Sequence, residues 1–147
     1  MESKYEFLQA CKDNNVLIVN EFLIAPPSDC EDINEFKLFI VIGFSRAVCW
    51  ESVDVIGILI ENEFIGERHL YLSFVDACAN RSVKMMNMII QNTKWNPVWD
   101  GNNALDEVEP IRNFSISYKL LQDPRIFTTN IFPETNKFIS PLLKLLS

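Results

Sequence analysis

The sequence predicts an all-α fold, a solenoid of short helix-turn-helix repeats, and this prediction begins with one recurring apolar pattern. The pattern is clearest over residues 74–90. There an apolar residue lies three positions before Ala77, and further apolar residues lie 6, 8, 9, 12 and 13 positions after it. The same pattern fits at three further reference residues, Ala10, Ala47 and Val108, with the polar Ser117, nine positions after Val108, as the one exception. Successive reference residues are 37, 30 and 31 positions apart, and such a period is typical of repeat proteins.

Length and composition agree with one stacked globular domain. The chain has 147 residues, of which 48% are hydrophobic and 22% charged, so it is long enough to bury a continuous core. Each short helix pair carries apolar residues on more sides than it covers by itself. Each pair must therefore bury them against the next pair, which predicts a stack of about four repeats.

Prolines and polar segments set the expected element boundaries. Pro26 and Pro27 end the second helix of the first repeat, and Pro110 makes the first helix of the fourth repeat short or kinked. The segment 28–43 is an insertion whose apolar half is either a short added helix or an extended, strand-like loop. The repeats are expected at residues 5–25, 44–62, 74–92 and 104–122, and a C-terminal capping helix at residues 135–147.

Charge and hydropathy restrict the class of partner. Thirteen Lys and Arg face 20 Asp and Glu, a formal net charge of −7, which argues against nucleic acid as a partner. No apolar run approaches the roughly 18 residues of a membrane span, and no basic and apolar secretory signal is present. We therefore expect an intracellular protein without a membrane partner. The apolar segment Leu38 to Ile42 is the candidate contact of a homodimer.

The sequence gives little support for catalysis or for a cofactor. His69 is the single histidine, and the acidic residues within 29–35 lack the spacing of a calcium loop. Only four glycines are present, so a glycine-rich phosphate loop is not expected. We predict no enzyme, no catalytic residues, no metal and no cofactor. The sulfur-containing side chains are interpreted as packing residues that form neither a disulfide nor a metal site. They are Cys11, Cys30, Cys49, Cys78, Met85 and Met86.

The repeat unit resembles the ankyrin repeat. It has an alanine in the first helix, apolar residues ending the second, and a period near 33 residues. The signature Thr-Pro-Leu-His-x-Ala survives only as Phe7 with Ala10, Phe44 with Ala47, Phe74 with Ala77 and Leu105 with Val108. A closer resemblance is to the divergent ankyrin repeats of large DNA viruses of amoebae, whose linkers read Leu-Leu-x-Asp-Pro-Arg. This chain has Leu-Leu-Gln-Asp-Pro-Arg at residues 120–125, and the resemblance covers residues 5–126.

The resemblance implies where a partner protein would bind. Ankyrin repeats usually bind partners on a concave side, formed by the loop before each first helix and by the exposed positions of that helix. In this chain those positions include Trp50, Arg68, His69, Tyr71, Asn80, Trp99 and Asp100, together with Leu38, Phe39 and Val41 from the insertion. Tryptophan, tyrosine and arginine are enriched among binding hot spots. The alternative for Trp50 and Trp99 is packing against the insertion or a neighbouring loop, whereas Trp95 aligns with Ile126 and is expected in the core.

Three functions follow from these expectations. The first is a non-enzymatic module that binds a partner protein, and the viral resemblance makes a host protein one candidate. The second is an adaptor that recruits a ubiquitin ligase, because Phe132-Pro133-Glu134 and the apolar residues after it resemble the start of an F-box. The third is an enzyme or small-ligand protein, which would need a cavity lined by His69 and several carboxylates.

Overall fold

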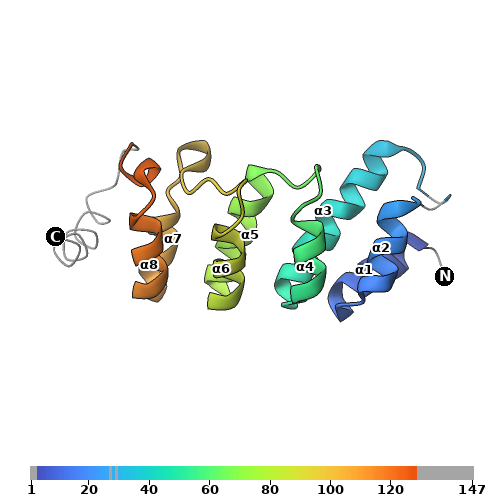
Figure 1. The fold of residues 1–147 in the computed structure, drawn as a ribbon, viewed down its shortest axis with the longest axis horizontal. Helices are drawn as coiled ribbons and strands as arrows, with labels where there is room; N and C mark the ends of the chain where they lie inside the picture. The colour runs from blue at the N-terminus through green and yellow to red at the C-terminus, as the bar shows by residue number, and fades with distance from the viewer. Residues whose placement is uncertain (1–2, 27, 29, 129–147) are drawn as a thin grey trace. The chain divides into compact units, whose positions relative to one another are not determined.

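The computed structural model describes residues 3–26, 28 and 30–128 (Figure 1). Over this part of the chain the regular structure is entirely helical, with no strand, which confirms the all-α prediction. The expected capping helix at residues 135–147 and the F-box-like segment lie outside the described residues. Within those residues, no helix is long and apolar enough to cross a membrane. The chain divides into two compact units, Met1–His69 and Leu70–Ser147, which are described one at a time.

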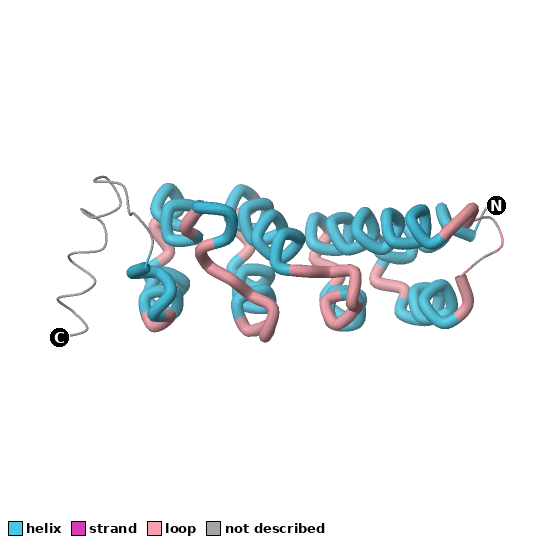
Figure 2. Tube along the Cα trace, turned by 90° about the horizontal axis from the view of Figure 1, so that it is seen from above, coloured by secondary structure: helices cyan, strands magenta, loops and turns pink. Residues whose placement is uncertain are grey.

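The first unit contains two helix pairs. They are α1 (Ser3–Asp13) with α2 (Val16–Ile24), and α3 (Ile33–Cys49) with α4 (Val53–Leu59). Helix α1 packs against both α2 and α3, as Figures 1 and 2 show. Most of the expected insertion, residues 28–43, forms the first part of α3 and continues unbroken into the helix predicted from residue 44. Asp32 caps this helix by accepting a hydrogen bond from the Glu35 N–H at 2.9 Å, so the helical alternative is the correct one.

Close packing between α1 and α3 places part of the apolar segment Leu38 to Ile42 in the core and leaves Val41 and Ile42 half-buried. Phe39 is 9% exposed and Ile40 is fully buried, whereas Leu38 remains 54% exposed. The segment therefore does not form an unbroken exposed apolar patch, because a helix packed on one side turns only part of each turn to solvent. The homodimer stays a prediction, with Leu38 as its one strongly exposed apolar residue in this segment.

The second unit repeats the helix-pair arrangement with shorter elements. Its helices are α5 (Glu67–Ala79, whose first turn belongs to the first unit), α6 (Val83–Ile90), α7 (Ala104–Val108) and α8 (Phe114–Leu121). Short 3₁₀ segments occupy Trp99–Gly101, Glu109–Ile111 and Pro124–Thr128. Helix α7 ends just before the segment that contains Pro110, which confirms the prediction of a short first helix in this repeat.

The turn inside each helix pair has the same backbone conformation. The residue four positions after each reference residue has a positive φ, namely Asn14 (59°), Glu51 (53°), Arg81 (56°) and Arg112 (49°). The next residue caps the second helix. In the first three pairs its N–H donates to the carbonyl of the reference residue at 2.9 Å, which is a Schellman-type helix ending. The 37, 30 and 31-residue spacing is thus present in the backbone as well as in the apolar pattern.

A second turn recurs after the second helix of three pairs. Asn62, Asn92 and Asp123 each accept a hydrogen bond from the backbone N–H two residues later, at 2.9 to 3.0 Å. This Asx turn directs the residue three positions on into the core: Ile65, Trp95 and Ile126 are at most 4% exposed. The prediction that Trp95 is a core residue is confirmed.

Candidate functional site

The predicted partner-binding residues fall in different surroundings. Trp50, Arg68 and His69 belong to the first unit, and Tyr71, Asn80, Trp99 and Asp100 belong to the second. Trp50 is 59% exposed, with the Lys12 Nζ 4.4 Å from its ring centroid, so it carries a surface cation–π contact. Arg68, Asn80 and Asp100 are exposed, while His69 and Trp99 are half-buried.

One hollow gathers predicted partner-facing residues in the first unit. It has a volume of about 500 Å³, and we call it the α3 hollow; it is lined by Asn34, Lys37, Leu38, Val41, Phe64 and His69. Four of these residues come from α3 at positions i, i+3, i+4 and i+7, which place them on one face of a helix. Phe64 lies in the loop after α4, and His69 lies in the first turn of α5.

The walls of the α3 hollow are mainly apolar, with one cation. The Lys37 Nζ lies 5.0 Å from the centroid of the Phe64 ring, and within the described ranges Lys37 forms no ion pair. The His69 Nδ1 accepts a hydrogen bond from the Gly66 N–H at 3.0 Å, which leaves the proton of the neutral ring on Nε2. No carboxylate lines the hollow, so the cavity required for the enzyme alternative, with His69 beside several carboxylates, is not formed here.

Tyr71 is a correction to the predicted site. Its ring is stacked on Trp95, with centroids 6.1 Å apart, and its centroid lies 5.9 Å from that of Trp99. These two rings leave Tyr71 only 2% exposed, so its side chain is not available to a partner. Trp99 is half-buried, and its contact with Tyr71 is to a residue of α5, whereas the packing alternative named the insertion or a neighbouring loop.

The hydroxyl of Tyr71 has unusual surroundings. It is buried, and it has no hydrogen-bond partner in the described part of the chain. Burial raises the pKa of Tyr71 far above its usual range, and the carboxylates of Glu107 and Asp106 raise it further. Burial also raises the pKa of Glu107, with a contribution from Asp106. Tyr71 therefore stays neutral at physiological pH and acts as a packing residue.

None of the four cysteines, all of which lie among the described residues, forms a disulfide, and they do not all lie in the core. Cys11 and Cys78 are buried, and burial raises the pKa of each thiol to about 12, which makes them poor nucleophiles near neutral pH. Cys49 is exposed and Cys30 is half-buried, so the packing interpretation is wrong for Cys49. Met85 and Met86 are at most 1% exposed, as predicted. In the described ranges, no group of three or more His, Cys, Asp or Glu is placed to hold a metal ion.

The sequence did not single out Asn34, Lys37 and Phe64 as site residues. The signal for the first two was the i, i+3, i+4, i+7 spacing of residues 34, 37, 38 and 41, which becomes visible only once residues 33–43 are assigned to a helix. Phe64 carries no such signal, because it lies in a loop and reaches the hollow through tertiary packing.

Comparison of the chain with protein-family models, curated proteins and solved structures found no match.

Proposed function

We propose that this chain is a non-enzymatic protein-binding module built of four degenerate ankyrin-like repeats. The recurrence of one left-handed turn residue after each reference residue supports the repeat assignment. The observation that carries the binding function is the α3 hollow, where one helix face, a loop phenylalanine and His69 form an open, mainly apolar surface. Leu38, Val41 and His69 occupy register positions at which ankyrin repeats usually contact partners.

The chemistry of the α3 hollow indicates the type of group that it binds. Leu38 and Val41 offer an apolar surface on which a partner side chain loses contact with water. The ammonium group of Lys37, held beside the Phe64 ring, suits a carboxylate next to that side chain. The proposed partner therefore presents an apolar residue adjacent to an acidic one. Because α3 is packed against α1, the surface is formed before binding, and little ordering is needed.

Matched surface variants test this function. Leu38→Asp places a charge in the hollow, whereas Phe114→Asp makes the same type of change at a site that is 61% exposed on α8. Partner proteins captured by the wild-type chain are identified by mass spectrometry, purified, and titrated against each variant by calorimetry. We expect at least a roughly tenfold increase in Kd for Leu38→Asp and for Lys37→Glu, and less than about twofold for Phe114→Asp.

Two results would contradict the proposal. One is a set of purified partners whose Kd is equally insensitive to Leu38→Asp and Phe114→Asp, with unchanged melting temperatures; this would place binding away from the hollow. The other is the absence of any protein that binds the purified chain in a saturable manner, which would exclude the binding function itself.

A further inference from the structure

Helix α2 exposes apolar residues at positions that are polar in the other three repeats. Leu17 and Ile24 are 76% and 84% exposed. They lie 7 and 14 positions after the reference residue Ala10. At the same register, the other repeats carry exposed polar residues: Asp54, Lys84 and Ser115 for the first position, and Glu61, Gln91 and Gln122 for the second. Only the first repeat therefore keeps an apolar surface where the common pattern has a solvated one.

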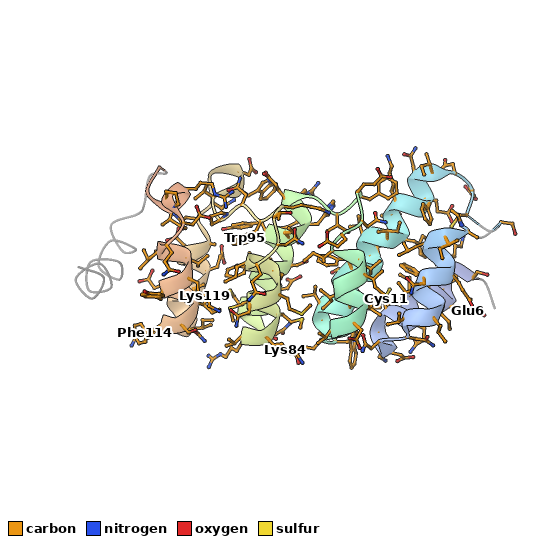
Figure 3. The ribbon with its side chains drawn as sticks, viewed as in Figure 1. Glu6, Cys11, Lys84, Trp95, Phe114 and Lys119 are labelled. Carbon is orange, nitrogen blue, oxygen red and sulfur yellow. The ribbon has the colours of Figure 1, made fainter. Side chains whose placement is uncertain are left out.

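These residues belong to a continuous face beside a shallow hollow. Leu17, Glu21 and Ile24 are at i, i+4 and i+7, so they lie along one side of α2. A hollow of about 300 Å³ adjoins them, lined by Ser3, Glu6, Ile18, Glu21, Phe22 and Ala25. Figure 3 shows Glu6 on the side of the α1–α2 pair that is turned away from α4. We call this surface the α2 face.

The second unit shows what covers the equivalent positions elsewhere in the molecule. Lys119, Leu120 and Asp123 have the same register as Glu21, Phe22 and Ala25. They line a smaller hollow, of about 200 Å³, whose other wall is supplied by α6 and the turn after it, through Ile90, Gln91 and Trp95. Lys119 also donates a hydrogen bond to the Asn87 side chain on α6, and Figure 3 shows Lys119 on the side of α8 that is turned toward α6. A helix thus packs beside the register positions of Glu21, Phe22 and Ala25, whereas the positions of Leu17 and Ile24 correspond to the exposed Ser115 and Gln122 of α8.

The charges on the α2 face define the helix that it would accept. Glu6 and Glu21 line the hollow, and within residues 3–26, 28 and 30–128 neither side chain forms an ion pair or a hydrogen bond. We infer that the α2 face binds an amphipathic α-helix of a partner protein, with Lys or Arg next to its apolar stripe. The apolar stripe contacts Leu17 and Ile24, and the cation meets Glu21. In a two-fold pair of this chain, the same face would oppose itself and bring equal carboxylates together, which disfavours a second copy.

A displayed peptide library provides the probe. A phage library of 18-residue helical peptides is selected against the wild-type chain and counter-selected against Leu17→Asp/Ile24→Asp. We expect the enriched peptides to carry Lys or Arg beside an apolar i, i+3, i+4, i+7 stripe. For a synthetic copy of such a peptide, anisotropy titration should show Kd raised about tenfold by Glu21→Lys and changed less than twofold by Glu63→Lys, an equal charge change at an exposed loop residue of the same unit.

Three outcomes would overturn the inference. The first is that no peptide distinguishes the wild-type chain from the double variant while both have the same melting temperature. The second is enrichment of acidic or uncharged peptides. The third is a wild-type dimer in sedimentation that Leu17→Asp dissociates, because this would assign the face to a second copy. The α2 face and the α3 hollow share no residue, so either surface can fail its test without affecting the other.

Discussion

Val41 and Tyr71 occupy the same register position in the two units, six residues before the reference residue, but their exposure differs. Val41 is half-buried and lines the α3 hollow, whereas Tyr71 is 2% exposed beneath Trp95 and Trp99. The two tryptophans come from the loop and the 3₁₀ segment that follow α6. The comparison shows that the repeat register fixes the buried side of a helix, while the loops decide how much of the other side stays open.

The packing of the first helices differs in the same way. In the first unit, the 17-residue helix α3 packs along α1 and supplies a long surface. In the second unit, α7 has only five residues, and aromatic side chains fill the layer around Tyr71. The packing layer at the first helices is therefore completed by a long helix in the first unit and by aromatic side chains in the second unit.

The largest expected effect tests the aromatic layer. Trp95→Ala removes a 4%-exposed ring that contacts both Tyr71 and Phe74, and we expect it to lower the free energy of unfolding by about 3–5 kcal/mol. Trp50→Ala, at a 59%-exposed tryptophan, should cost about 1 kcal/mol or less. Urea denaturation monitored by circular dichroism measures both. Equal losses would show that the aromatic layer does not stabilise the second unit in the way described.

A smaller effect tests the helix packing of the first unit. A Cβ added to Gly43 would lie 2.6 Å from the Phe7 ring and 2.8 Å from the Cys11 Sγ, so these side chains or the two helices must shift to accept it. We expect Gly43→Ala to destabilise the chain by about 1–3 kcal/mol. Gly57→Ala is the control, because no atom lies within 4 Å of its added Cβ; it should be neutral or stabilise α4 by up to about 1 kcal/mol. A stable Gly43→Ala variant would contradict the α1–α3 contact.

The unpaired hydroxyl of Tyr71 gives a prediction of opposite sign. Tyr71→Phe removes a buried polar atom that has no hydrogen-bond partner among the described residues, while the stacked ring remains. We expect a gain of up to about 1 kcal/mol in unfolding free energy. Tyr118→Phe, at a 47%-exposed position, should change it by less than about 0.5 kcal/mol. A clear loss of stability in Tyr71→Phe would show that the hydroxyl is paired in solution.

The smallest effect compares Cys11 and Cys78, which lie one residue after their reference residues. Burial raises each thiol pKa from about 9 to about 12, so the unfolded chain loses these protons first as the pH rises. The contribution of each thiol to stability is therefore nearly complete at pH 8 and is lost progressively as the pH rises from there to about 12. From pH 8 to pH 9, each thiol should account for roughly 0.4 kcal/mol of that loss.

Alanine variants separate these contributions. Urea midpoints measured at both pH values should fall less steeply for Cys11→Ala and for Cys78→Ala than for the wild-type chain. Cys49→Ala is the matched control for the loss of a thiol, because this thiol is exposed. If Cys49→Ala alone changed the dependence of the urea midpoint on pH, the assignment of buried thiols to this register position would be wrong.

Much of the local structure could be predicted from residue types and spacing. The apolar pattern located the second helices, Pro110 shortened α7, and the alignment of Trp95 with Ile126 identified both as core residues. These features depend on interactions within a few turns of helix, which the neighbouring sequence specifies. The site was predicted less well: Leu38, Val41 and His69 do share a hollow, but Tyr71 was wrongly expected on the surface.

By itself, the sequence determined the helical class, the register of the buried residues and the positions where helices end, because these follow from periodicity and from backbone constraints at proline and capping residues. Only the tertiary structure decided that residues 33–43 extend α3, that Gly43 lets α1 approach closely, and that Tyr71 is covered while Leu38 stays open. Those outcomes depend on which side chains meet across segments distant in sequence, such as Lys37 with Phe64, and a linear pattern does not encode that meeting.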